Sequence, residues 1–288
     1  MDVPLLVSPQ WLHDHLTDPA VQVLENAWIA DAYPRAHIRG AHSVPGHPYL
    51  KKNSANGERT CHVMEAAEFA ALCHELGLRR DRHYVIYDDY YGLFAARFWC
   101  VCRYFGLSNI SILDGSWRGW LEQGRPASCC QEVPTPGTDV VAVPQASAFI
   151  GWEELQLLHH DPDVQVWDTR RFTEYTGEED TDNRRRGHVP GALNLVWTDL
   201  LREPAYAGGP RFLKPLTELD LLLADLGLRR DNTIITYCQS GIRAAFAIFV
   251  LKLLGYPHHR LYDASMGEWA NLSEPPLRTG PGIAVSAD

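Results

Sequence analysis

The chain has 288 residues, a net charge of −10 and a hydrophobic content of 45 %, a composition typical of a globular protein. No apolar run reaches the roughly 18–20 residues that cross a membrane, and the N-terminus shows no signal-peptide pattern, so we expect a cytoplasmic protein without membrane partners. The acidic balance excludes nucleic acid as the expected partner, but it is compatible with a small anionic substrate.

Seven cysteines are present, at positions 61, 73, 100, 102, 129, 130 and 238. An odd number without a secretory signal indicates reduced thiols rather than a disulfide framework. Cys100 and Cys102 lie in an apolar helical run and are predicted to pack in a core, whereas Cys129 and Cys130 are predicted to be exposed. Neither pair has the spacing of a zinc site, so we expect no metal and no other cofactor.

Four blocks recur in the same order in the two halves of the chain. The blocks are 18–25 with 161–168, 37–41 with 188–192, 76–81 with 226–231, and 113–120 with 262–269. Such repetition predicts one domain used twice. We therefore expect an N-terminal domain over residues 1–126, a linker rich in Pro, Gly, Ser and Thr over 127–147, and a C-terminal domain over 148–288.

Each half alternates short β-branched runs with helical patterns. In the second half, strands are predicted at 164–167, about 192–195, 233–237 and 260–262, and helices at 151–159, 215–226 and 243–254. This alternation predicts an α/β fold in which a mostly parallel sheet is flanked by helices. In such folds a ligand binds beyond the carboxyl ends of the strands.

Cys238 follows the predicted strand Thr233–Tyr237 and precedes a helix. A side chain in this place faces unpaired backbone N–H groups and the positive end of the helix dipole, which favour an anion. The thiolate form of cysteine is a nucleophile. Cys238 is therefore the candidate catalytic residue.

The first half differs at this position. Aligning strand Tyr84–Tyr87 with Ile234–Tyr237 places Asp88 opposite Cys238, and the loop after Asp88 is one residue longer. A carboxylate is not a sulfur nucleophile, and its charge opposes anion binding. The N-terminal domain is therefore predicted to be catalytically inactive.

Together, the tandem halves, the block Gly187–Ala192, Asp88 at the cysteine position and the strand–loop–helix context of Cys238 resemble the two-domain rhodaneses, the thiosulfate/3-mercaptopyruvate sulfurtransferase family. The resemblance covers about residues 8–269. It implies a rhodanese-like fold in each half and a transferase that moves a sulfane sulfur through a persulfide on Cys238. The implied partners are a small anionic sulfur donor and a thiol, cyanide or protein acceptor.

The loop after Cys238 is predicted to form a nest of backbone N–H groups around the sulfur. Its residues are Gln239, Ser240, Gly241, Ile242 and Arg243, of which Gly241 suits an unusual backbone angle and Arg243 adds positive charge. Among arginines elsewhere, Arg186 is the preferred contact for the donor, with Asp168 and Arg170 in possible supporting roles. Glu174 stands where many relatives carry a donor-binding arginine.

Three alternatives stay open at this stage. Cysteine phosphatases have five residues between cysteine and arginine, whereas four lie between Cys238 and Arg243, a tighter loop that favours a single sulfur over a phosphate. The donor is predicted to be thiosulfate, with 3-mercaptopyruvate as the alternative. A persulfide carrier with little turnover is the third possibility.

His37 and His188 occur in the same repeated block, including the half without the cysteine. A position shared by an active and an inactive copy indicates a structural hydrogen bond rather than a general base.

Overall fold

The computed structural model describes residues 3–282 and divides into two compact units. Unit 1 is the N-terminal part up to Gln145 without Thr60–His62, together with Leu201–Leu213. Unit 2 is Ala146–Leu200 and the part from Lys214 onward, together with Thr60–His62. In the described residues, no helix combines the length and the apolar character needed to cross a membrane.

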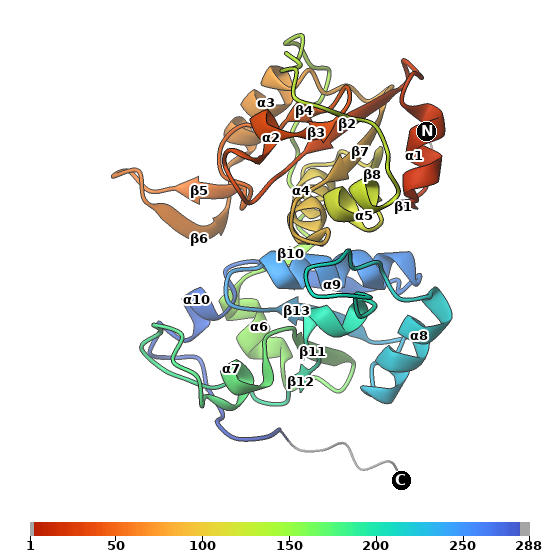
Figure 1. Ribbon diagram of the computed structural model, residues 1–288. Coiled ribbons are helices and arrows are strands. Elements are labelled where there is room, and N and C mark those ends of the chain that lie inside the picture. Colours follow the sequence, from red (N-terminus) through yellow and green to blue (C-terminus); the bar gives the residue numbers. More distant parts are fainter. Residues whose placement is uncertain (1–2, 283–288) are drawn as a thin grey trace. The chain divides into compact units, whose positions relative to one another are not determined.

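Unit 1 holds a parallel sheet with the strand order β1-β8-β7-β2-β4 (Figure 1). The strands of this half are β1 Leu6–Val7, β2 Val21–Glu25, β3 His37–Ile38, β4 His42–Ser43, β5 Lys51–Asn53, β6 Arg59–Val63, β7 His83–Tyr87, β8 Ile110–Leu113 and β9 Ala127–Ser128. The helices are α1 Pro9–His15, α2 Ala32–Arg35, α3 Ala66–Glu75, α4 Leu93–Tyr104 and α5 Ser116–Glu122. Helix α4 packs on β7 and β8.

Unit 2 repeats this arrangement with the order β10-β14-β13-β11-β12, again all parallel. Its strands are β10 Phe149–Ile150, β11 Val164–Asp168, β12 Leu193–Asn194, β13 Thr233–Tyr237 and β14 His259–Tyr262. Its helices are α6 Trp152–Leu158, α7 Phe172–Thr176, α8 Leu216–Asp225, α9 Ile242–Leu253 and α10 Ser265–Trp269, with a 3-10 turn at Trp197–Leu200. The predicted tandem α/β fold is therefore confirmed.

The predicted linker contains β9 and runs along unit 1. Strand β9 pairs with β3, the Gly137 N–H donates to the His74 carbonyl (2.8 Å), and the Gln145 N–H donates to the Tyr104 carbonyl (2.7 Å). Backbone hydrogen bonds thus hold this segment although it lacks a periodic pattern.

Burial follows the predictions for two pairs of cysteines. Cys100 and Cys102 are buried on α4, because the apolar helix lies on the sheet. Cys129 and Cys130 are exposed directly after β9.

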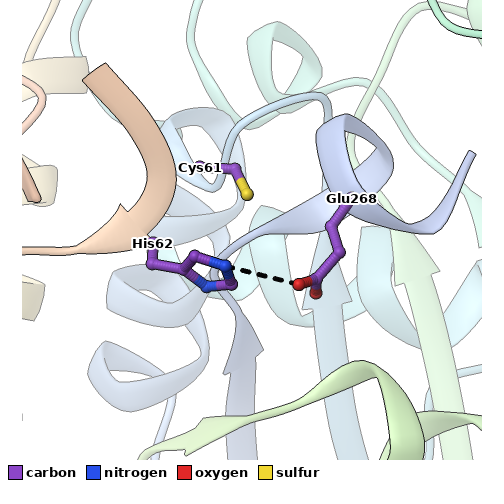
Figure 2. Close-up of side chains that lie close together, drawn as sticks. All are labelled: Cys61, His62 and Glu268. Atoms are coloured by element: carbon purple, nitrogen blue, oxygen red, sulfur yellow. Dashed lines mark ion pairs between the residues drawn. The ribbon is translucent and has the colours of Figure 1, made fainter. Parts of the chain in front are cut away.

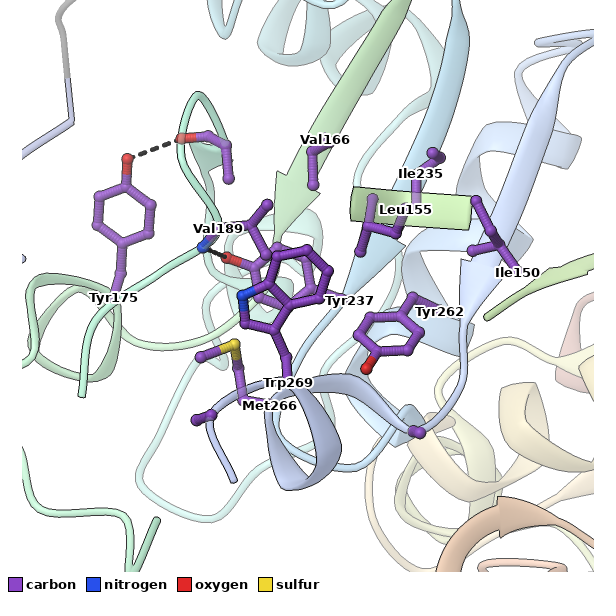
Figure 3. Close-up of a cluster of buried hydrophobic side chains, with 13 residues drawn as sticks. Ile150, Leu155, Val166, Tyr175, Val189, Ile235, Tyr237, Tyr262, Met266 and Trp269 are labelled. Atoms are coloured by element: carbon purple, nitrogen blue, oxygen red, sulfur yellow. Dashed lines mark hydrogen bonds between the residues drawn. The ribbon is translucent and has the colours of Figure 1, made fainter. Parts of the chain in front are cut away.

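In unit 2, one core cluster joins side chains of the sheet to side chains of α6 and α10 (Figure 3). Tyr237, the last residue of β13, is buried beside Met266 and Trp269 of α10. Its hydroxyl accepts a hydrogen bond from the Val189 N–H (3.2 Å). This buried hydrogen bond connects the end of β13 to the loop before β12. It thereby restricts the position of Tyr237, which directly precedes Cys238.

Candidate active site

Cys238 lies at the carboxyl end of β13, the middle strand of the unit 2 sheet, and is 1 % exposed. Strand β13 pairs with β11 on one side and β14 on the other. The Cys238 N–H donates to the Ser265 hydroxyl (3.1 Å), and the Cys238 carbonyl accepts from the Met266 N–H (3.1 Å). The backbone of the candidate nucleophile is therefore held from both sides.

The loop after Cys238 turns into α9 at Gly241. This residue has a positive φ of 76°, and a Cβ atom here would lie 2.4 Å from the Asp263 carbonyl oxygen. Both the backbone conformation and the close approach require glycine, so the prediction for Gly241 is confirmed.

The first turn of α9 presents N–H groups without a protein acceptor. Within residues 3–282, no group accepts a hydrogen bond from the backbone N–H of Gly241, Arg243 or Ala244. Ser240 is half-buried and Ile242 is buried in the same loop. Unpaired donors at the start of a helix favour an anion, which is compatible with the anion-binding loop that the sequence predicts.

The equivalent place in unit 1 is filled by the side chain of Asp88. One carboxylate oxygen accepts from the N–H groups of Tyr90 and Gly92 (both 2.8 Å), and the other accepts from Phe94 (2.6 Å) and Ala95 (2.9 Å). Gly92 begins α4 as Gly241 begins α9. Burial raises the pKa of Asp88, and these hydrogen bonds oppose the shift.

Arg243 does not stand free beside the loop. Its guanidinium forms a bidentate ion pair with the Glu174 carboxylate, with N–O distances of 2.6 and 2.9 Å. Burial acts to raise the pKa of Glu174, but the hydrogen bonds and charge of Arg243, aided by Arg171, outweigh it and lower the pKa to about 2. The positive charge that Arg243 was expected to add to the loop is therefore balanced by Glu174, which the sequence indicated only as the place of a missing arginine.

Gln239 is held by a residue that the sequence analysis did not select. Its side-chain amide exchanges two hydrogen bonds with Asn183, at 3.1 and 3.0 Å. Asn271 also donates to the Asn183 oxygen (3.0 Å). These amides fix the exposed side of the loop, and no local sequence pattern links them.

Asp168 and Arg170 form a buried ion pair at the end of β11. The Arg170 guanidinium donates to both Asp168 oxygens, with distances from 2.6 to 3.0 Å, and also to the Gly187 carbonyl (2.8 Å). Both side chains are at most 1 % exposed. Asp168 thus holds the Arg170 guanidinium, and the charge of Arg170 is compensated within the fold.

Arg186, the preferred donor contact, lies on the surface. Its side chain is 47 % exposed and pairs with Asp180. To bind the sulfur donor, Arg186 must give up its ion pair with Asp180. The neighbouring Arg185 instead donates to the carbonyls of Pro275 (2.7 Å) and Trp269 (2.8 Å).

The two repeated histidines make the same structural contacts. The Nδ1 atom of His37 lies 2.7 Å from the Tyr33 carbonyl, and the Nδ1 atom of His188 lies 2.8 Å from the Tyr175 carbonyl. Each ring also stacks on that tyrosine. The expectation of a structural role is confirmed.

Ser265 is a further residue that the sequence analysis missed. Its counterpart Ser116 accepts from the Asp88 N–H (2.8 Å), just as Ser265 accepts from the Cys238 N–H. The sequence contained evidence for this role, because both serines occupy the same position in the repeated block 113–120 and 262–269.

The model of the rhodanese-like domain matches residues 8–123 and again residues 152–272. The chain belongs to the rhodanese family. The resemblance seen in the sequence is thereby confirmed for both halves, and the two parallel sheets described above are the two rhodanese domains.

Similar rhodaneses carry names with different sulfur donors. The chain is 30 % identical to 3-mercaptopyruvate sulfurtransferase of Escherichia coli (strain K12), over 96 % of this chain and 99 % of the relative. It is 32 % identical to thiosulfate sulfurtransferase of Azotobacter vinelandii, over 96 % and 97 %. These relatives support sulfur transfer as the activity and do not decide between the two donors.

A similar solved structure is that of SseA from Escherichia coli, described as a 3-mercaptopyruvate sulfotransferase with the rhodanese fold. It superposes with a TM-score of 0.77 at 30 % identity, covering 91 % of this chain and 99 % of that one.

Proposed function

We propose that this protein transfers a sulfane sulfur from thiosulfate to a thiophilic acceptor through a persulfide on Cys238. The observation that carries the proposal is the contrast between the two loops. Four N–H groups bind the Asp88 carboxylate in unit 1. The counterparts of three of them after Cys238, the N–H groups of Gly241, Arg243 and Ala244, have no acceptor within residues 3–282. Such donors suit the charge of a thiolate and of a persulfide.

The reaction proceeds in two displacement steps. The Cys238 thiolate attacks the outer sulfur of thiosulfate, a new S–S bond forms, and the S–S bond of the donor breaks with sulfite leaving. An acceptor such as cyanide or a thiol then attacks the outer sulfur of the persulfide. The Cys238 thiolate leaves with the electron pair of that bond, so the enzyme returns to its starting state.

Thiosulfate as donor is supported by the exposure of the Arg243–Glu174 pair. The Arg243 side chain is 20 % exposed, whereas that of Glu174 is only 3 % exposed. Arg243, the positive member of the pair, is therefore the one more accessible from solvent. Its attraction is stronger for thiosulfate, a dianion, than for the single carboxylate of 3-mercaptopyruvate. The relative named for 3-mercaptopyruvate makes that donor the second candidate.

The test is thiocyanate formation from cyanide with each donor in turn. Cys238→Ser is expected to lower the rate by at least about a thousandfold, because it removes the nucleophile. Cys130→Ser, at an exposed cysteine, is the matched control and is expected to keep the wild-type rate. Equal activity of Cys238→Ser and wild type contradicts the site. A higher kcat/KM with 3-mercaptopyruvate contradicts the choice of thiosulfate.

A further inference from the structure

Cys61, His62 and Glu268, none of which has been given a role above, gather at one place in unit 2 (Figure 2). Cys61 and His62 are neighbours on β6, and Glu268 lies on α10. The thiol sulfur, one ring nitrogen of His62 and one carboxylate oxygen all lie within 4.8 Å of one another. Figure 2 shows the three side chains directed toward a common point.

The distances fit a small tetrahedral ion. Zinc binds histidine nitrogen and carboxylate oxygen at about 2.0–2.2 Å, which at a tetrahedral angle separates these two ligand atoms by about 3.4 Å. The His62 Nε2 atom lies 3.4 Å from the Glu268 Oε1 atom. The longer zinc–sulfur bond of about 2.3 Å needs a slightly wider spacing to the thiol, which the limit of 4.8 Å allows with a small side-chain rotation.

Glu268 is oriented by a second contact. Its Oε2 atom accepts a hydrogen bond from the Tyr262 hydroxyl (2.8 Å), which leaves Oε1 for the site. Tyr262 is fully buried, so this hydrogen bond is shielded from solvent. A carboxylate ligand held by an outer hydrogen bond is the usual arrangement in metal sites.

The other two ligands differ in their surroundings. Cys61 is partly buried and packs against the unit 2 core cluster. His62 is 57 % exposed, so solvent reaches the cluster and a water molecule can serve as the fourth ligand. Three protein ligands with one open position make a site of the catalytic zinc type rather than a closed structural one.

We propose that Cys61, His62 and Glu268 bind a divalent ion of the zinc class, with water as the fourth ligand. The thiolate and the carboxylate together carry two negative charges, which balance the ion. A thiolate ligand with an imidazole selects zinc over magnesium or calcium, which prefer oxygen.

The site is linked to the Cys238 loop through α10. The N–H groups of Met266 and Gly267 on this helix donate to the carbonyls of Cys238 (3.1 Å) and Gln239 (2.8 Å). An ion held by Glu268 therefore fastens the helix that supports the loop. This gives the ion a stabilising effect on unit 2 that is measurable apart from sulfur transfer.

A plain ion pair between His62 and Glu268 is the competing explanation. A pair with one partner 57 % exposed contributes at most about 1 kcal/mol, and it involves no thiol. The two explanations therefore differ in whether Cys61 takes part.

The experiment titrates the metal-free full chain with Co²⁺, because cobalt bound to a thiolate gives a charge-transfer absorption in the near ultraviolet. It is carried out in a Cys238→Ser background, so that the active-site thiol is not a ligand. One equivalent of Co²⁺ is expected to bind with this absorption. The absorption is lost in Cys61→Ser, and Co²⁺ affinity falls at least about tenfold in His62→Ala and in Glu268→Gln.

Cys130→Ser serves as the control and is expected to bind Co²⁺ as the background protein does. His62→Ala changes an exposed side chain, so its loss of affinity cannot be ascribed to unfolding, which thermal melting of each variant verifies. The proposal is overturned if the background protein shows no charge-transfer absorption. It is also overturned if any of the three ligand variants binds Co²⁺ as tightly as the background protein.

Discussion

The loops after β7 and β13 have the same backbone framework but differ in the residue at its centre, which is Asp88 in the first and Cys238 in the second. Each follows a buried strand, turns at a glycine with positive φ and enters a helix of 12 residues. In unit 1 the Asp88 carboxylate occupies the N–H groups from within the chain. In unit 2 three equivalent donors, the N–H groups of Gly241, Arg243 and Ala244, have no protein acceptor within residues 3–282. One framework therefore serves stability in one copy and is available for an external anion in the other.

The carboxylates at the ends of β2 and β11 show a second contrast. Asp168 is paired with the buried Arg170. Glu25, at the equivalent position, instead accepts from the Tyr87 hydroxyl (3.1 Å). Burial raises the pKa of Glu25 to about 8, with the hydrogen bond from Tyr87 opposing the shift. The same strand end thus carries a paired charge in unit 2 and an acid that resists ionisation in unit 1.

The largest expected effect on stability comes from substitutions that remove the difference between Asp168 and Glu25. Asp168→Asn leaves Arg170 buried without its carboxylate and is expected to cost unit 2 roughly 3–5 kcal/mol of unfolding free energy. Glu25→Gln is expected instead to raise the unfolding free energy of unit 1 at alkaline pH. Hydrogen exchange of β13 amides for the first variant and of β7 amides for the second measures each unit separately.

The sign for Glu25 follows from proton linkage. The folded state binds this proton more tightly than the unfolded chain, so its stabilising contribution is complete below about pH 4.5 and is lost as pH rises toward about 8. Glu25→Gln removes this dependence and makes the stability of unit 1 flatter over that window. Stability profiles of equal slope for the wild type and for Glu25→Gln contradict the raised pKa.

The next largest effect on stability is expected from substitutions of Asp88 and Cys238, the residues that differ between the two loops. Asp88→Asn places an amide NH₂ against backbone N–H groups and is expected to cost unit 1 about 2–3 kcal/mol. Cys238→Ala removes no hydrogen bond of the side chain and is expected to cost unit 2 about 1 kcal/mol. Asp81→Asn, at a surface ion pair with Arg79, is the control. Equal losses for Asp88→Asn and Cys238→Ala, measured by urea unfolding, contradict the assignment of different roles.

The smallest effect concerns donor choice. Glu174→Gln keeps an acceptor for the Arg171 N–H but leaves the charge of Arg243 unbalanced. The ratio of kcat/KM for thiosulfate to that for 3-mercaptopyruvate is expected to rise about tenfold, because a dianion gains more from the added charge. Glu179→Gln is the matched control. A uniform loss with both donors indicates a structural role for Glu174 and contradicts this account.

Local patterns in the sequence predicted much of this fold. Strand β13 and helix α9 were predicted within a residue or two, because a short β-branched run, a loop with glycine and a long apolar helix are each local features. The repeat identified Asp88 as the counterpart of Cys238. The necessity of Gly241 also follows from local backbone geometry.

Contacts between distant segments could not be predicted in this way. Glu174 and Arg243 form an ion pair although no periodicity in the sequence relates them. The same applies to Asn183 with Gln239. The search for zinc-type spacing missed Cys61 and His62, because their third partner, Glu268, comes from the other end of the chain.

The most direct test of the central claim is the intact mass of the protein after exposure to thiosulfate and removal of the donor. The account predicts a gain of one sulfur atom, located on the peptide that contains Cys238, lost on treatment with cyanide and absent in Cys238→Ser. An unchanged mass, or a sulfur gain that persists in Cys238→Ser, contradicts it.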